Sequence, residues 1–493
     1  ARIPDPLWSR GLGDVYKRQV LPLVYMIRYA PSMEQPLDSK KSFFSERSLT
    51  EASSFFKLAI PMFLTQLALQ FIQVNSVIQS GNYSTDVQAG IMLAGNIWFP
   101  IMVGIGGVLF FVTPMVAQFY GARNLKDIGP LARQAIWLSI PIILVGMFIL
   151  SQASFILTVA KVDPSIIKYS EEYLDYFMFA LPAILLSQPL RSLCEGVTRP
   201  LPITLLNILM LIIAIIGNYT FIYGNFGFPE MGAKGAGLSA IIGTWTTFLL
   251  LIIYLKFKSG FGTELFSRFD LPNIKILGEI LRGGIPVGFG NFIELSMFSG
   301  AGIILGRFGS EVIAANGIAM TIGGLFFMIP LSIGNAAAVR VGNNVGANDM
   351  KGAKYSSYFS LRLATVSALI MSLIIILNAE FMSSLLNNNS EVIALAVILL
   401  SFAAFFQLAD GLAMASIGSM RGYKDTFGPM KIMAISYWGV GLPLGIILSI
   451  TDIVTTQMGA VGMWTGMASG LLVAAVLMVR RVRKISTKFI NEN

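Results

Sequence analysis

Twelve long apolar stretches decide what this chain can fold into. Each is close to or beyond the 20 or so mostly apolar residues that an α-helix needs to cross a bilayer, and short polar connectors separate them. Only helices and closed barrels satisfy their backbone hydrogen bonds inside hydrocarbon. The sequence therefore predicts an all-α polytopic membrane protein with 12 transmembrane helices, at about 55–79, 89–118, 131–156, 172–194, 202–223, 236–257, 279–305, 312–337, 355–378, 391–418, 429–450 and 459–480.

The composition agrees with this class and excludes much chemistry. The 493 residues are 55% hydrophobic and only 12% charged, about half the charge of a soluble domain. With Cys194 as its single cysteine and with no histidine, the chain can form neither an internal disulfide, nor a Cys/His zinc site, nor a histidine-based triad. It also has no Walker loop and no nucleophile motif, so we expect no enzyme, no cofactor and no ATP hydrolysis by this chain.

The net charge of +9 reflects membrane topology and not nucleic-acid binding. If both termini lie inside, seventeen basic residues fall in or beside the inward connectors and four in the outward ones. This excess is what the positive-inside rule requires. We therefore expect the protein to lie in the cytoplasmic (inner) membrane, with both termini in the cytoplasm. The four outward residues are Lys161, Lys168, Lys234 and Arg307.

The two ends of the chain are predicted to be tails. The first methionine is Met26, and the apolar run at 20–25 is too short to span and has no cleavage pattern of small residues behind it, so we expect no signal peptide. Residues 1–54 are interpreted as an amino-terminal tail, of which 1–25 form a candidate non-native lead. Residues 481–493 are interpreted as a cytoplasmic tail.

The chain repeats itself at a nearly constant offset. Because six spans return the chain to the same side, the repeat divides the protein into two parallel six-helix bundles at 55–258 and 279–480, joined by a polar cytoplasmic linker at 259–278. Parallel repeats suggest a two-fold axis along the membrane normal with a substrate path between the halves. The repeated pairs are Gly121 with Gly346, Pro61 with Pro286, Gly196 with Gly422, and Gly232 with Gly459.

Two carboxylates lie in the middle of apolar spans, Glu294 in the seventh and Asp410 in the tenth. An acid at membrane depth costs about 2.5–3.5 kcal/mol on insertion scales, so it normally faces a protein-lined or water-lined cavity. Two buried carboxylates that approach each other take up a proton or hold a cation between them. For Na⁺, Asn291 and Gln407 would be further oxygen ligands. The alternative is that each acid pairs with a base or caps a helix break, but no Lys or Arg lies mid-span nearby in the sequence.

Other polar and aromatic residues have two interpretations each. The first span carries Gln66, Gln70 and Gln73 on one helical face, followed by Asn75, and the fifth carries Asn207 and Asn218. They either line the cleft or form hydrogen bonds between packed spans. The candidates for lining the cleft are Gln70, Asn75, Asn218, Phe292 and Phe406, the two aromatics because each lies within about one turn of an acid.

Several motifs between 55 and 480 together resemble the multidrug and toxic compound extrusion (MATE) family, in its bacterial multidrug-efflux branch. The resemblance implies two six-helix lobes around a V-shaped cleft, and export of cationic amphipathic compounds in exchange for Na⁺ or H⁺. The motifs are Leu58-Ala59-Ile60-Pro61, Thr113-Pro114-Met115-Val116-Ala117-Gln118, Pro229-Glu230-Met231-Gly232, Phe327-Met328-Ile329-Pro330 and Arg421-Gly422-Tyr423-Lys424-Asp425.

The resemblance also assigns roles to single residues. Glu294 matches the seventh-helix acid that the family uses in cation coupling, and Asp410 matches its tenth-helix acid. Phe406 stands where the sodium-coupled branch often has a tyrosine, so it offers no oxygen. Asn75 stands where the family commonly has an aspartate, which puts a proton site in the amino-terminal lobe in doubt. The pair Glu294 and Asp410 is left as the coupling centre.

From these features we expect a secondary active multidrug exporter, working as a monomer in the lipid bilayer on small organic cations. Two alternatives remain open. One is a flippase for lipid-linked saccharides, which shares the helix arrangement but needs a cationic cavity for phosphate groups. The other is an exporter of organic anions or metabolites. A channel fits two unlike halves with buried acids less well than alternating access does.

Overall fold

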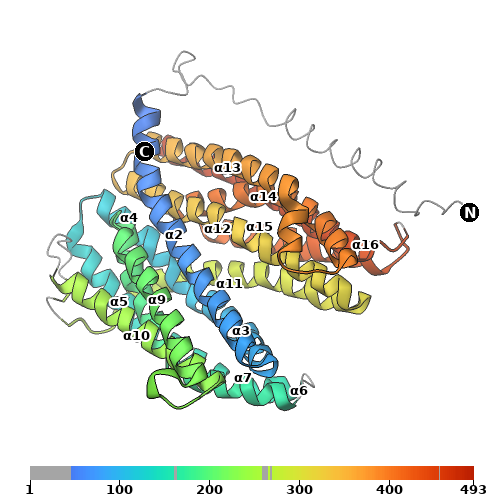
Figure 1. Cartoon of the computed structure of the whole chain (residues 1–493). Coiled ribbons are helices and arrows are strands. Elements are labelled where there is room, and N and C mark those ends of the chain that lie inside the picture. The colour runs from blue at the N-terminus through green and yellow to red at the C-terminus, as the bar shows by residue number, and fades with distance from the viewer. Residues whose placement is uncertain (1–45, 160–163, 258–264, 267–268, 455, 493) are drawn as a thin grey trace, which may run out of the picture. The chain divides into compact units, whose positions relative to one another are not determined.

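The computed structural model describes residues 46–159, 164–257, 265–266, 269–454 and 456–492. From Ser53 onward the described residues belong to one compact unit, which contains nearly all of the helical bundle. Its described residues form helices joined by short turns (Figure 1). Eleven of these helices are long and apolar enough to cross a membrane, or twelve if one bent pair is a single span. The predicted fold class is therefore confirmed, whereas the proposed lead at 1–25 lies outside the described residues.

Six predicted spans make up the amino-terminal half. Its helices are α2 (Glu46–Tyr83), α3 (Thr85–Gly104), η1 (Gly106–Phe111), α4 (Val112–Gly121), η2 (Leu125–Asp127), α5 (Ile128–Ser151), α6 (Ala153–Val159), α7 (Pro164–Phe177), α8 (Leu181–Gly196), α9 (Leu201–Tyr223), η3 (Asn225–Gly227) and α10 (Ala233–Phe257).

The carboxyl-terminal half repeats this order. Its helices are α11 (Ile274–Leu305), η5 (Gly306–Phe308), α12 (Ser310–Gly346), α13 (Met350–Ser384), α14 (Ser390–Gly422), α15 (Phe427–Met433), the π-helix η6 (Ala434–Gly441), α16 (Leu442–Ile450) and α17 (Gly459–Glu492). The last helix continues through residues 481–492, for which a tail was predicted.

Three spans are not regular α-helices. The predicted fourth span, 172–194, consists of α7 and α8, which meet at a bend of 50°. Pro182 lies in the first turn of α8, and because proline has no N–H it cannot continue the hydrogen bonds of the preceding turn. The second span changes to a 3₁₀-helix at η1, and the eleventh contains the π-helix η6.

Each half has its own apolar core, and the first helix of each half also packs on the core of the other. Phe55, Leu58 and Met62 of α2 belong to the buried cluster of the carboxyl-terminal half, where the Phe55 ring lies 5.6 Å from that of Phe359 on α13. Ile280 of α11 belongs to the cluster of the amino-terminal half. The two halves therefore exchange the starts of their first helices.

The internal repeat predicted from the sequence recurs in the backbone contacts. Gly196 and Gly422 occupy equivalent places, since a Cβ on the first would lie 2.6 Å from Val116 and one on the second 2.7 Å from Val341. Gly232 and Gly459 both have φ of +55°. Each of these turns is followed by a helix that packs closely on its predecessor, so the two halves are two copies of one architecture.

The halves meet backbone to backbone where α4 and α12 end. A Cβ on Gly121 would overlap the carbonyl oxygen of Asn343, and one on Gly346 would overlap the carbonyl oxygen of Gln118. These are equivalent contacts seen from the two halves. We refer to the end of the bundle that contains them as the seam end, and only glycine fits there because any side chain would separate the helices.

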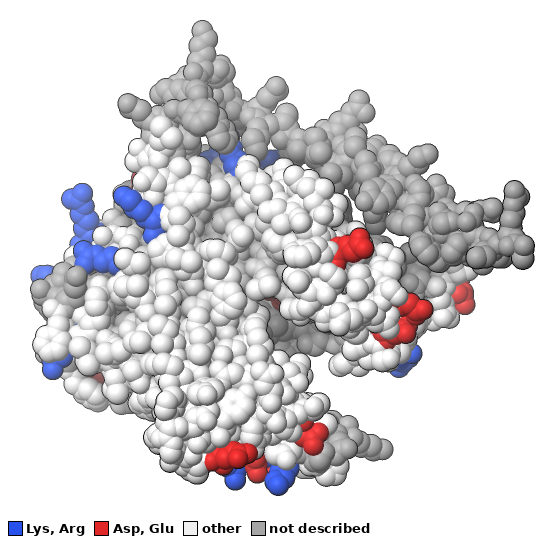
Figure 2. Space-filling view, in the orientation of Figure 1, with Lys and Arg blue, Asp and Glu red and all other residues white. Residues whose placement is uncertain are grey.

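Charge is distributed unevenly over the surface. Figure 2 shows most of the visible Lys and Arg residues toward the upper left, where helices such as α4 and α13 have their ends in Figure 1, and Asp and Glu residues mainly along the bottom and right. The connectors at the seam end carry many of the basic residues, among them Arg123, Lys126, Lys351, Lys354 and Lys424. The placement of the seam end in the cytoplasm remains a prediction.

Candidate functional site

The seventh-span acid, Glu294, lies in the second half of α11. This helix begins at an N-cap, where the Asn273 side chain accepts hydrogen bonds from the backbone N–H groups of Lys275 and Ile276. Pro286 lies inside it, about two turns before the acid. Glu294 is half-buried and lies beside the fully buried Ile293, so α11 holds its carboxylate at the inner surface of the carboxyl-terminal half.

The tenth-span acid, Asp410, lies near the middle of α14, the most apolar of the long helices. Small buried residues surround it in the sequence, including Ala409, Gly411 and Ala413, and a Cβ on Gly411 would lie 3.3 Å from the carbonyl oxygen of Ala364 on α13. Asp410, the residue before this contact, lies within electrostatic range of Glu294. The structure therefore brings the two predicted acids together.

Three buried oxygens, one of them on Asp410 itself, have no hydrogen-bond partners among the described residues. They are Oδ1 of Asp410, Oε1 of Gln407 and Oη of Tyr437. Gln407 is 3% exposed and Tyr437 is fully buried. Buried polar atoms almost always have a partner, and a cluster of carboxylate, amide and hydroxyl oxygens is the set that hard cations such as Na⁺ bind.

A basic residue that the sequence placed in a connector also reaches the site. Arg421, in the last turn of α14, interacts electrostatically with Glu294, and its Nη2 lies 3.5 Å from Oδ1 of Asn291. No Lys or Arg lies near Glu294 along the sequence, but the fold brings Arg421 within electrostatic range of it. The sequence does not reveal this contact, because Arg421 lies eleven residues after Asp410 and on a different helix from Glu294. Along the packed helices, Arg421 lies beside Asn291, which precedes Glu294 by one turn of α11.

Asn291 connects the site to the amino-terminal half. Its Nδ2 donates to the carbonyl oxygen of Val103 on α3 at 3.3 Å, while its Oδ1 accepts from Arg421. A small cavity of about 10 Å³ lies beside Asn291 and Arg421, lined also by Pro286 and Met433, and it has room for a single water. Asn291, predicted as a cation ligand, thus uses its carboxamide in contacts between helices.

Of the predicted cleft-lining polar residues of the amino-terminal half, Asn75 lies in the packing of α2 against α9. Asn75 donates to the carbonyl oxygen of Ala214 at 3.4 Å and accepts from Gln79 at 2.8 Å. Asn218 is 3% exposed on α9, and Gln70 is half-buried on α2. The bond from Asn75 to Ala214 is an interhelical hydrogen bond, which was one of its two interpretations, whereas the bond from Gln79 lies within α2.

The two aromatic candidates differ in their surroundings. Phe406 is buried and stacks on Trp464 of α17, with ring centroids 5.2 Å apart and planes 11° from parallel. Phe292 is 44% exposed and forms an aromatic group with Phe289 and Trp438. Phe292 therefore presents a free edge to a ligand or to lipid, whereas one face of Phe406 is occupied by the core.

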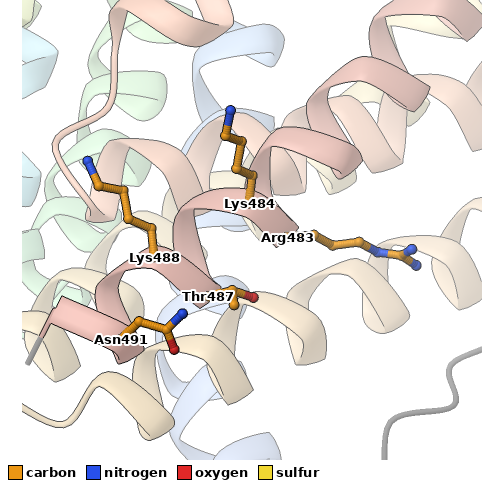
Figure 3. Close-up of a pocket in the computed structure, with 5 residues that line it drawn as sticks. All are labelled: Arg483, Lys484, Thr487, Lys488 and Asn491. Carbon is orange, nitrogen blue, oxygen red and sulfur yellow. The ribbon is translucent and has the colours of Figure 1, made fainter.

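A second, wider hollow lies away from the acids, along the last turns of α17. It has a volume of about 650 Å³ and is lined by Arg483, Lys484, Thr487, Lys488 and Asn491 (Figure 3). These basic side chains extend from one helix toward open space, as Figure 3 shows. A basic hollow is unsuited to cationic compounds, and it has none of the buried oxygens of the acidic pair.

Comparison with known proteins agrees with the helical fold and its two halves. The MatE family model matches residues 61–220 and 286–447, one match in each half. The chain is 32% identical to the probable multidrug resistance protein NorM of Shewanella oneidensis, over 88% of this chain and 95% of that protein. It is 33% identical to the multidrug resistance protein PmpM of Pseudomonas aeruginosa, over 91% and 94%. The crystal structure of the eukaryotic MATE transporter AtDTX14 superposes with a TM-score of 0.81 at 19% identity, covering 90% of this chain and 99% of that one.

Proposed function

Because the chain belongs to the MATE family of multidrug transporters, we propose that it exports organic cations in exchange for a monovalent cation that binds at Glu294 and Asp410. The protein is a multi-pass membrane protein and not an enzyme. The proposal places it as a monomer in the cytoplasmic membrane with the seam end and both termini inside. One observation carries the assignment of the coupling site: two carboxylates interact across α11 and α14, beside buried oxygens that lack partners among the described residues.

The charges at the site favour one coupling cation per cycle. Glu294 and Asp410 bring two negative charges when ionised, and Arg421 brings one positive charge. An uncompensated charge at membrane depth is costly, so a single Na⁺ or H⁺ is enough to neutralise the group. A cationic compound would meet the same demand, and it would therefore compete with the coupling cation for the acids.

Competition for one group of acids explains how exchange would occur. With the coupling cation bound the site is neutral, and with the cation gone an organic cation is attracted to it. If the seam opens in one of these states and closes in the other, the two cations cross in opposite directions, since a ligand shifts a conformational equilibrium by its difference in affinity for the two states. The same acids disfavour phosphate-bearing lipids and organic anions as cargo.

Efflux from proteoliposomes tests this proposal. The vesicles would be loaded with a fluorescent organic cation, and efflux followed under an imposed Na⁺ gradient and then under a proton gradient. We expect one gradient to accelerate efflux, and Glu294→Gln and Asp410→Asn to abolish the acceleration while the proteins stay folded. Glu391→Gln, at the exposed start of the same helix α14, should behave like the wild type. No response to either gradient, or a wild-type response in Asp410→Asn, would overturn the assignment.

A further inference from the structure

The π-helix η6 gives the eleventh span an irregular turn next to the acids. Its segment Ala434–Gly441 continues α15 and leads into α16, and the backbone N–H of Leu442 donates to the carbonyl oxygen of Tyr437, five residues earlier. A π-turn inserts one extra residue into a helix, so the side chains after it face a different direction, and such turns occur frequently at functional sites. The residue whose carbonyl accepts in this turn is Tyr437.

Close packing against α17 holds the π-turn in place. A Cβ on Gly470 would lie 2.8 Å from both the carbonyl oxygen of Ser436 and the Cα of Gly441, and a Cβ on Gly466 would overlap the backbone of Gly445. On the other side, Trp438 donates from its Nε1 to Oγ of Ser296 on α11 at 2.8 Å. The segment therefore touches both α17 and the helix that carries Glu294.

This packing puts the Tyr437 side chain inside the protein, near both acids. Tyr437 is fully buried and interacts electrostatically with Glu294 and with Asp410. Its hydroxyl has no hydrogen-bond partner among the described residues, and the same is true of Oδ1 of Asp410 and Oε1 of Gln407. A buried tyrosine hydroxyl normally finds a partner, and Gln407 lies one turn before Asp410 on α14, so a ligand beside Asp410 would satisfy oxygens from two helices.

We propose that the Tyr437 hydroxyl is an oxygen ligand of Na⁺ at the coupling site, together with Asp410, Glu294 and Gln407. The hydroxyl has lone pairs for a cation and a hydrogen to donate to a carboxylate. With Na⁺ bound, its oxygen faces the cation. Tyr437 therefore sets the affinity and selectivity for the cation, without itself carrying charge.

This inference rests on the proposed function, because it assigns a further residue to the same site. A simpler role for Tyr437 is to fill the core of the carboxyl-terminal half, to which it belongs. The two roles make opposite predictions for the hydroxyl alone. Tyr437→Phe keeps the ring and removes only the oxygen, so it leaves the packing role intact and abolishes the ligand role.

The first measurement is the Na⁺ concentration that gives half-maximal efflux of the fluorescent cation from proteoliposomes. For Tyr437→Phe we expect this concentration to rise about tenfold, the effect of losing one interaction with a charged partner, with the maximal rate little changed. The matched control is Tyr173→Phe, a buried tyrosine in the core of the amino-terminal half, for which we expect no rise. An unchanged Na⁺ requirement in Tyr437→Phe would overturn the inference.

The second measurement does not depend on transport. A cation that binds only the folded protein raises its melting temperature with concentration, so purified wild-type protein should melt higher in Na⁺ than in K⁺ at equal ionic strength. Tyr437→Phe should need about tenfold more Na⁺ for the same rise, while Tyr173→Phe should follow the wild type.

The outcomes separate this inference from the function on which it rests. If wild-type efflux responds to neither gradient, the exporter proposal itself fails. If it responds only to a proton gradient, and Na⁺ does not raise the melting temperature, the exporter proposal stands and the Na⁺ site with Tyr437 is overturned. A response to Na⁺ that is equal in wild type and Tyr437→Phe overturns the role of the hydroxyl alone.

Discussion

The side-chain amide of Gln118 donates a hydrogen bond of 2.9 Å to the backbone carbonyl oxygen of Gly422, which lies 304 residues further along the chain. Gln118 is on α4 of the amino-terminal half, and Gly422 ends α14, directly after Arg421. This bond joins the seam to the helix that carries Asp410. A change at the coupling site that moves the end of α14 would therefore act on the seam directly.

Replacement of Gln118 by alanine should loosen the seam. The loss of one hydrogen bond is worth about 1 kcal/mol, so we expect amides of residues 118–124 and 343–349 to exchange their hydrogens about fivefold faster, measured by mass spectrometry. Gln152→Ala, at an exposed position after α5, should leave these segments unchanged. Equal exchange in both variants would show that the seam closes without the Gln118 bond.

Replacement of Gly346 by alanine should be far more disruptive than replacement of another glycine on the same helix. Its Cβ would overlap the carbonyl oxygen of Gln118, whereas a Cβ on Gly317 meets nothing within 4 Å. Overpacking costs about 1–3 kcal/mol, so Gly346→Ala should shift the protein away from the closed seam and slow efflux at least tenfold. Gly317→Ala should transport normally, and normal transport by Gly346→Ala would show that the seam is not part of the cycle.

Arg421 should determine how many coupling cations bind. Arg421→Gln leaves two carboxylates without their positive neighbour, so the site should take a second cation, and equilibrium binding should rise from one Na⁺ per protein to two. Arg421→Lys keeps the charge and should retain a ratio of one. The maximal efflux rate of Arg421→Gln should fall, because more strongly held cations leave slowly. A ratio of one in Arg421→Gln would show that the arginine does not neutralise the acids.

An ion pair should hold the connector between the halves on the amino-terminal half. Arg133 on α5 binds Asp270 at 2.6 Å and also donates to the carbonyl oxygen of Leu265 at 3.0 Å. Arg133→Met and Asp270→Asn should each destabilise the protein by about 2 kcal/mol, seen as a lower melting temperature, and the double variant should be little worse than either.

The control for this ion pair is Lys234→Met, which removes an exposed partner of Glu172 at 3.8 Å and should change the melting temperature little, as is usual for surface pairs. Equal effects of Arg133→Met and Lys234→Met would show that the connector is not held by Arg133.

The features that the sequence predicts well are those that repeat or are carried by one residue type. The twelve spans follow from the length of the apolar stretches. The two halves follow from pairs such as Gly121 with Gly346, because a backbone contact that requires glycine places a glycine at the equivalent position of each half. Glu294 and Asp410 can be singled out as candidates because a charge inside an apolar span is rare, and their role stays a prediction. None of these predictions depends on the direction in which a side chain points.

The features that were missed all depend on direction. Tyr437 looks like one more aromatic in an apolar span, and the sequence does not show that it lies in a π-helix and is fully buried. Arg421 belongs to a charged connector in the sequence, but the last turn of α14 directs it back to Asn291. The stacking of Phe406 on Trp464, 58 positions away in the chain, likewise depends on how α14 and α17 face each other.

The backbone contacts of Gly121 and Gly346 also limit how the two halves can move. A side chain at an interface can change rotamer and absorb a small displacement, but a glycine packed on a carbonyl group has no such freedom. Because packed interfaces of this kind are bistable and do not deform gradually, we expect the seam to have two stable states, joined and parted, with no partly open state between them. We then expect ions not to leak through a half-open protein. The lack of side chains at Gly121 and Gly346, and not a gating side chain, would prevent this leakage.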